Sequence, residues 1–286
     1  MARILITGIT GTIGKELEKG LLLNGHEVIG DATNSKRIQH KGYFESIDHS
    51  ATIDVVYHLA AKSFVPDSWE QPADFIETNV LGTNRVLEFC RKHTIKIILV
   101  SSYAYGIPKY LPIDEKHPVA AANPYGLSKL MGEELCQFYG RHFNVPYTII
   151  RPFNVYGTAG NKKLLIPEII EQIESGERIQ VKDLLPKRDY IFIDDLIDLL
   201  IQALKDDKNA IYNAGSGEAL SVAEVIETCQ RVWQSNLPVT SAKVTRQNEI
   251  PETCADMRFV KEKLNWQPNY SFEQGIRKMK ERIKNG

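Results

Sequence analysis

Two hydrophobic periodicities alternate along the first half of the chain. Short apolar runs read ARILIT, HEVIG, DVVYHLA, IKIILVSS and VPYTIIRPF, and each predicts a strand. Between them, apolar residues recur at helical spacing over about residues 13–24, in ETNVLGTNRVLEFCRKH and in SKLMGEELCQFYGRHF. Strands that alternate with helices predict an α/β fold, in which helices cover both faces of a doubly wound parallel sheet. We expect residues 1–152 to form this Rossmann-like domain.

The pattern becomes less regular after Phe153. Helices are predicted in IPEIIEQIESG, in SVAEVIETCQRVW and at the basic C-terminus, and the segment RDYIFIDDLIDLLIQAL lies among them. No repeat or low-complexity linker separates the halves. Residues 153–286 are therefore expected to form a smaller C-terminal lobe, with segments that return to the first domain.

Composition narrows the possible partners. The chain has 286 residues, 43% of them hydrophobic, which is enough for a full core. Its 35 basic and 36 acidic residues nearly balance, so the basic excess of a nucleic-acid binder is missing. The opening MARILITG resembles neither a signal peptide nor an apolar span of ~20 residues, so no membrane partner is expected.

The cysteines indicate neither a metal site nor a disulfide framework. Four are present, widely spaced and without a C-x-x-C pair. We therefore expect the four cysteines to be reduced, buried thiols and the protein to be cytoplasmic.

A glycine-rich turn, ITGITGTIG, follows the first predicted strand and opens the first helix. Glycines at the spacing G-x-x-G-x-x-G permit a tight turn and let backbone N–H groups and the helix N-terminus approach a pyrophosphate. Asp31 ends the second predicted strand about twenty residues later, where a carboxylate accepts hydrogen bonds from ribose hydroxyls and repels a 2′-phosphate. The pattern predicts NAD, and nearby basic residues leave NADP open. The turn residues expected to contact the cofactor are Gly8, Thr10, Gly11, Thr12, Ile13 and Gly14.

The stretch NPYGLSK places a tyrosine four residues before a lysine. Asn123 and Pro124 suit the N-cap and first turn of a helix, so Tyr125 and Lys129 should project from one face of it. A free phenol has a pKa of ~10, and a neighbouring ammonium favours its phenolate. Tyr125 is therefore a candidate general acid/base that Lys129 tunes.

A serine pair supplies the third candidate catalytic group. The predicted strand IKIILVSS ends in Ser101 and Ser102. Open α/β sheets bind ligands at the carboxyl ends of their strands, so these hydroxyls could hold a substrate oxygen beside the tyrosine.

Together these motifs resemble the extended short-chain dehydrogenase/reductase family, in particular its NAD-dependent nucleotide-sugar epimerase/dehydratase branch. The likeness runs along nearly the whole chain and includes HLAAKSFVPDSWEQP, ETNVLGTNRVLE, SSYAYG, RPFNVYG, RDYIFIDDL, NAGSGEALSV and ADMRFVKEKLNWQPNYSFEQG. It implies a Rossmann domain and a C-terminal lobe that holds a nucleotide diphosphate sugar.

The resemblance also implies residue roles. Tyr125 would exchange a proton with a sugar hydroxyl, Lys129 would bind the nicotinamide ribose, and a serine would steady the reacting oxygen while a hydride passes between sugar and nicotinamide. Asn79 matches the family's asparagine in the preceding helix, although such a polar residue can instead simply kink the helix. Other matching positions lie near the cofactor (Leu59, Ala60, Ala61 and Lys62) or near the substrate (Asn154 and Arg188).

Two departures from the family pattern bear on these roles. The family motif S-[ST]-x-x-V-Y-G is one residue longer than SSYAYG, so either serine of the pair can occupy the catalytic position, and we favour Ser102. The chain between Asp31 and DVVYHLA is also short and lacks the Asp-hydrophobic pair that contacts adenine in the family.

The resemblance favours a C4 epimerase of a nucleotide diphosphate hexose. Family 4,6-dehydratases carry an acid directly after the catalytic Ser/Thr, whereas Tyr103 and Ala104 stand here. The alternative is a 4-keto-6-deoxy nucleotide-sugar reductase using NAD(P)H, and a non-catalytic NAD-binding sensor is a third possibility. The apolar helix faces around residues 80–89 and 130–139 are candidates both for the core and for the dimer interface found in the family, and a homodimer is expected.

Overall fold

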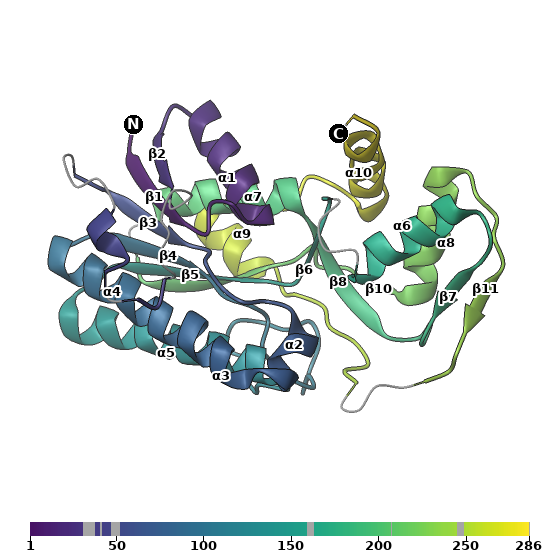
Figure 1. Ribbon diagram of the computed structural model, residues 1–286, viewed down its shortest axis with the longest axis horizontal. Coiled ribbons are helices and arrows are strands. Elements are labelled where there is room, and N and C mark those ends of the chain that lie inside the picture. Colours follow the sequence, from purple (N-terminus) through teal and green to yellow (C-terminus); the bar gives the residue numbers. More distant parts are fainter. Residues whose placement is uncertain are drawn as a thin grey trace. The chain divides into compact units, whose positions relative to one another are not determined.

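A six-stranded sheet is built from five strands within residues 3–152 and a sixth, β9, from later in the chain (Figure 1). Its strand order is β2-β1-β3-β4-β5-β9, and the pairings of β1 with β2 and β3, of β3 with β4 and of β4 with β5 are parallel. The predicted Rossmann-like parallel sheet is confirmed. The strands are β1 (Arg3–Thr7), β2 (Glu27–Gly30), β3 (Val55–His58), β4 (Lys96–Val100), β5 (Tyr147–Pro152) and β9 (Ala210–Ala214).

The computed structural model describes residues 1–30, 38–40, 42–46, 52–158, 163–206, 208–244 and 249–285. Over these residues the chain divides into two units. The first unit comprises residues 1–106, 118–152 and 197–213, and the second comprises residues 107–117, 153–196 and 214–286.

Strand register brings several predicted site segments to one edge of the sheet. Thr7 pairs with His58, and His58 with Leu99, so β1, β3 and β4 end side by side. Val100 pairs with Ile150 of β5. The glycine turn, the segment after β3 and the serine pair all leave the sheet at this edge.

Amphipathic helices cover the sheet. Figure 1 shows α4 and α5 running along one side of it and α1 on the other. The helices of this unit are α1 (Thr12–Leu23), α2 (Val65–Glu70), α3 (Pro72–Phe75), α4 (Gly82–His93) and α5 (Pro124–Phe143), with the later part of α7 (Ile193–Gln202). A π-helical turn, η2 (Ile76–Leu81), precedes α4, and short 3₁₀ turns occupy η1 (Phe44–Ser46) and η3 (Ala203–Lys205). The core cluster includes Leu5, Val56, Leu87, Ile97 and Ile149, each of which is 0% exposed.

The second unit contains two small sheets and four helices along its described residues. β10 (Ala219–Ser221), β8 (Lys187–Phe192) and β6 (Asn154–Tyr156) form one sheet, and β11 (Val239–Ser241) pairs with β7 (Ile179–Val181) in the other. The helices are α6 (Leu165–Ser175), α8 (Val222–Trp233), α9 (Arg258–Leu264) and α10 (Phe272–Asn285). Three of these, α6, α8 and α10, correspond to helices predicted from the apolar periodicity.

Candidate active site

Helix α5 begins where its capping residues predict. The Asn123 side chain accepts a hydrogen bond from the N–H of Gly126 at 2.8 Å, and Pro124 occupies the first turn. Tyr125 and Lys129 therefore lie one helical turn apart, and both point inward: Lys129 is 7% exposed and Tyr125 is half-buried. The face predicted to carry the chemistry is turned toward the sheet.

The two serines at the end of β4 have different environments. The Ser102 hydroxyl lies close enough to the phenol of Tyr125 to lower its pKa as a hydrogen-bond partner. The Ser101 hydroxyl is buried without a hydrogen-bond partner among the described residues, while the Ser101 N–H bonds to the Ile150 carbonyl at 2.7 Å. Of the pair, the structure brings Ser102 to the tyrosine.

Burial dominates the ionisation of both groups on α5. Burial raises the pKa of Tyr125, and the Ser102 hydrogen bond offsets only part of that rise. Lys129 is not among the groups that shift the pKa of Tyr125 in the cofactor-free protein, and its ammonium donates to the Val100 carbonyl at 2.7 Å. Burial lowers the pKa of Lys129 from 10.5 to about 8, against the opposing charge of Glu133.

The glycine turn has the close contacts that a dinucleotide site requires. Gly8 has φ +76°, and a Cβ at this position would lie 2.7 Å from the Ala60 nitrogen. A Cβ on Gly14 would lie 2.7 Å from the Ile9 Cα, so only glycine lets α1 start this close to the turn. The N-cap of α1 is Gly11, and its first turn, residues 12–15, contains no acidic residue. An anion can therefore approach the positive end of this helix, and the turn fits a pyrophosphate.

The segment after β3 packs onto the turn and onto η2. The Leu59 N–H donates to the Thr7 carbonyl at 3.1 Å, and Ala61 follows half-buried. Asn79 is 2% exposed and bonds both backbone groups of Lys62, accepting from its N–H at 2.8 Å and donating to its carbonyl at 2.9 Å. Asn79 thus sits in a distorted helical turn and also fixes the predicted cofactor segment. The Lys62 ammonium pairs with Asp74.

The remaining predicted cofactor residues are at the tip of the glycine turn, at the start of α1 and after β2. Thr10, Gly11 and Thr12 are exposed at the tip of the turn, and Ile13 is half-buried in α1. Asp31, the predicted ribose ligand, lies outside the described residues.

A buried ion pair that the sequence reasoning missed braces the same helix. The Arg151 guanidinium of β5 donates to Glu133 of α5, with the shortest bond 2.6 Å, and to the Tyr105 hydroxyl at 2.9 Å. The Tyr105 hydroxyl donates to the Asn213 side chain at 2.6 Å. Glu133 is one turn beyond Lys129, so a charged residue recurring at helical spacing on an inward face was the available signal.

The predicted substrate residues lie on neighbouring strands of the second unit. The Asn154 side chain donates to the Asp189 carbonyl at 2.9 Å. Arg188 pairs with Glu249 and also donates to the Ile250 carbonyl at 2.7 Å. Both side chains are partly buried and have partners within their own unit.

Asp189, which sequence reasoning also missed, organises the loops around Arg188. It is fully buried, and its carboxylate accepts four hydrogen bonds, from the N–H and hydroxyl of Ser216 and from the N–H groups of Gly217 and Ala255. Burial nevertheless raises its pKa. In the sequence, only its position in the RDY motif pointed to Asp189.

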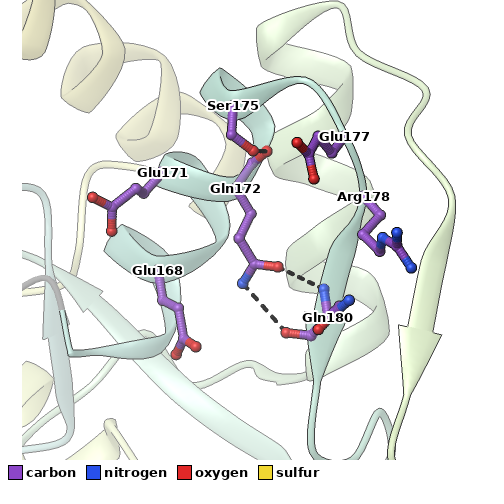
Figure 2. Close-up of a pocket in the computed structure, with 7 residues that line it drawn as sticks. All are labelled: Glu168, Glu171, Gln172, Ser175, Glu177, Arg178 and Gln180. Atoms are coloured by element: carbon purple, nitrogen blue, oxygen red, sulfur yellow. Dashed lines mark hydrogen bonds between the residues drawn. The ribbon is translucent and has the colours of Figure 1, made fainter.

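A surface pocket of about 650 Å³ lies elsewhere in the second unit, between α6 and β7 (Figure 2). Gln172 bridges it by bonding the N–H of Gln180 at 2.6 Å and the carbonyl of the same residue at 3.3 Å. Its lining is polar and contains none of the predicted site residues: Glu168, Glu171, Gln172, Ser175, Glu177, Arg178 and Gln180.

Metal-binding clusters and membrane-spanning helices are both absent from the described ranges. Within them, no group of three or more His, Cys, Asp or Glu side chains is arranged to hold a metal ion. No helix in the same ranges combines the length and apolarity needed to cross a bilayer.

The chain is similar to known nucleotide-sugar epimerases over almost its full length. The model of the NAD dependent epimerase/dehydratase family matches residues 4–215. A UDP-glucose 4-epimerase of Halalkalibacterium halodurans is 32% identical and aligns with 93% of this chain and 91% of its own length. The crystal structure of the Thermotoga maritima UDP-glucose 4-epimerase with UDP-glucose superposes with a TM-score of 0.91 at 26% identity, covering 99% of both chains.

A third structure is that of UDP-glucuronic acid 4-epimerase from Bacillus cereus, in complex with UDP-glucuronic acid and NAD. It matches with a TM-score of 0.86 and 28% identity and covers 99% of each chain. These similarities confirm both the resemblance read from the motifs and the Rossmann-like fold. The chain belongs to the NAD-dependent epimerase/dehydratase family and is an NAD-dependent enzyme.

Proposed function

We propose that the chain is a nucleotide-sugar 4-epimerase that interconverts UDP-glucose and UDP-galactose on a retained NAD. The observation that carries this proposal is the Ser102 hydroxyl beside the Tyr125 phenol, with Lys129 buried one turn further along α5. The similarity to UDP-glucose 4-epimerases supports the choice of substrate.

We assign NAD binding to the edge of the sheet where β1 and β3 end. The pyrophosphate would be held by the glycine turn and the N-terminus of α1, where the space left by Gly8 and Gly14 suits it. Asp31 is proposed for the adenosine ribose and Lys129 for the nicotinamide ribose. The bound cofactor would accept a hydride from C4 of the sugar and return it to the opposite face.

Tyr125 is proposed as the acid/base of the reaction. When C4 is oxidised, the hydroxyl proton on its oxygen must leave, and a Tyr125 phenolate can accept it and later give it back. Because burial raises the pKa of Tyr125, the phenolate needs a nearby positive charge, and the Lys129 ammonium is the candidate one turn away. The Ser102 hydroxyl, which lies beside the phenol, would donate a hydrogen bond to the same sugar oxygen.

The second unit is proposed to bind the nucleotide sugar. Asn154 would contact the substrate from β6, and Arg188 would offer its guanidinium to the diphosphate. Arg188 already pairs with Glu249, so substrate binding would exchange one anionic partner for another. This exchange would make Arg188 sensitive to the charge of the ligand.

We further propose that the enzyme is a cytoplasmic homodimer. Large apolar side chains along α5 are between 39% and 49% exposed, which is more than a solvated helix face usually presents: Leu127, Met131, Phe138 and Phe143. All four cysteines are free thiols, as a reducing compartment would keep them. Sedimentation should show a dimer at micromolar concentration and a monomer for Phe138→Lys, whereas a wild-type monomer would contradict the proposal.

The experiment that tests the proposed reaction omits added cofactor. The purified chain is incubated with UDP-galactose alone, and formation of UDP-glucose is followed by chromatography. We expect many turnovers per subunit for the wild type. Tyr125→Phe removes only the phenolic hydroxyl, and its turnover rate should be about 10²- to 10⁴-fold lower. Turnover that occurs only with added NADH or NADPH and a 4-keto-6-deoxy sugar nucleotide would indicate a reductase instead.

A further inference from the structure

A buried histidine stands between the two parts of the proposed cofactor site. His58 is the last residue of β3 and is 2% exposed. Its Nδ1 lies 2.8 Å from the Thr7 hydroxyl, and its Nε2 lies 2.9 Å from the Thr83 hydroxyl. Both ring nitrogens are therefore engaged by side chains from other elements, β1 and α4.

The partners of the two threonines set the direction of these bonds. The Thr83 hydroxyl donates its single proton to the Asn79 carbonyl at 2.5 Å, so it accepts from His58, whose Nε2 must carry the hydrogen. A neutral ring with a proton on Nε2 accepts at Nδ1, and the Thr7 hydroxyl donates there. The pKa of His58 is lowered to about 3, mainly by burial and further by the charge of Lys129, which keeps the ring neutral.

The hydrogen-bonded chain continues into the segments proposed to hold NAD. At the β1 end, Thr7 directly precedes Gly8, and its hydroxyl accepts from the Ala60 N–H at 3.4 Å. At the α4 end, Asn79 holds the backbone of Lys62 and donates to the Ser128 hydroxyl at 2.8 Å. The Ser128 hydroxyl in turn donates to the Tyr125 carbonyl at 2.7 Å.

The three side chains of the histidine bridge are buried. Thr7, His58 and Thr83 are each at most 2% exposed. If the histidine bridge were removed, two buried threonine hydroxyls would lose this partner. The segments on either side would have to shift to satisfy them.

We propose that His58 is a positioning residue for NAD: by donating to Thr83 and accepting from Thr7, it holds the glycine turn and the Asn79 turn in the relative placement that the cofactor needs. His58 contacts neither cofactor nor substrate in this scheme and acts through its two threonines. The inference rests on the proposed NAD site and adds a determinant of how firmly NAD is retained.

The test measures NAD affinity and thermal unfolding for three variants of the cofactor-stripped protein. Affinity is measured by calorimetric titration with NAD. His58→Leu removes the bridge, His58→Gln keeps one amide donor and one amide acceptor, and His142→Leu removes an exposed histidine on α5 as a matched control. Should His58→Leu fail to fold, Thr7→Val/His58→Leu/Thr83→Val replaces the bridge with apolar side chains and leaves no threonine hydroxyl unpaired.

The proposal predicts that NAD binds at least about tenfold more weakly to His58→Leu, or to the triple variant, than to the wild type. His58→Gln should recover most of the affinity, and His142→Leu should match the wild type. If His58→Leu or the triple variant binds NAD with wild-type affinity and only unfolds at a lower temperature, His58 has a purely structural role. That result would overturn this inference but leave the proposed function standing. A wild-type protein that does not bind NAD would overturn the proposed function as well.

Discussion

Replacing Lys129 with methionine should stabilise the cofactor-free protein at neutral pH while it removes catalysis. Lys129 is a buried ammonium that donates a hydrogen bond to the Val100 carbonyl, and Glu133 of α5 is a carboxylate that partly compensates its charge. Methionine has a similar length and no charge. The substitution therefore removes the cost of burying the ammonium and keeps the space filled.

The size of the effect follows from the pKa of Lys129, which burial lowers from 10.5 to about 8. That difference corresponds to a burial cost of about 3 kcal/mol when the lysine is charged in both states. Loss of the hydrogen bond to Val100 destabilises the native state by about 1 kcal/mol. The net free energy of unfolding of Lys129→Met should therefore exceed that of the wild type by about 2 kcal/mol at pH 7.

The pH dependence identifies the cause. Between pH 8 and pH 10.5 the unfolded chain keeps its Lys129 proton while the native protein has lost it, so the unfolded state binds more protons. Stability of the wild type therefore rises with pH in this window, relative to the variant. The advantage of Lys129→Met should shrink by about 2 kcal/mol between pH 8 and about pH 9.5.

Urea unfolding followed by circular dichroism measures this difference at each pH. Lys92→Met, at an exposed position on α4, serves as the control and should show a difference from wild type that stays constant with pH. A Lys129→Met advantage that does not change between pH 7 and about pH 9.5 would refute the reasoning, because burial of a charged lysine would then not be its source.

Three further predictions concern other buried polar groups. Ser102→Ala should lower kcat by about 10²-fold, whereas Ser101→Ala, which removes a hydroxyl without a partner among the described residues, should leave kcat within about threefold; equal losses would contradict the assignment. Glu133→Leu and Arg151→Leu should each cost about 3–5 kcal/mol in urea unfolding, and the double variant should cost less than their sum; strict additivity would show that the pair is not coupled. Asp189→Ala should cost at least about 3 kcal/mol because it leaves four donors unpaired, and Asp189→Asn should recover part of that; a loss below about 1 kcal/mol would contradict the role given to this carboxylate.

The features that could be predicted from the sequence depend on local chemistry. The cap at Asn123 and Pro124 determines where α5 starts, and therefore which face carries Tyr125 and Lys129. The glycine turn likewise follows from residues within a few positions of one another. Alternating strand and helix periods were sufficient for the central sheet, whose first five strands fall within the predicted runs.

Features that depend on distant residues could not be predicted. The turn at Asn79 is π-helical in a segment where its side chain bonds the backbone of Lys62, and nothing in the local pattern signals this. The motif favoured Ser102 but also allowed Ser101, because the position of each hydroxyl depends on how the chain leaves β4 beside α5. Strands β6, β7, β10 and β11 have three residues each, too few to show a period.

The most direct test of the central claim is the fate of the hydrogen on C4 of the sugar. UDP-galactose carrying deuterium at C4 is converted by the purified chain in ordinary water without added cofactor, and the UDP-glucose formed is analysed by mass spectrometry and NMR. The account predicts that deuterium stays at C4, because the hydride removed by the enzyme returns to the same carbon while Tyr125 handles only the proton on oxygen. Product that has exchanged this deuterium for solvent hydrogen would contradict hydride transfer and the proposed mechanism with it.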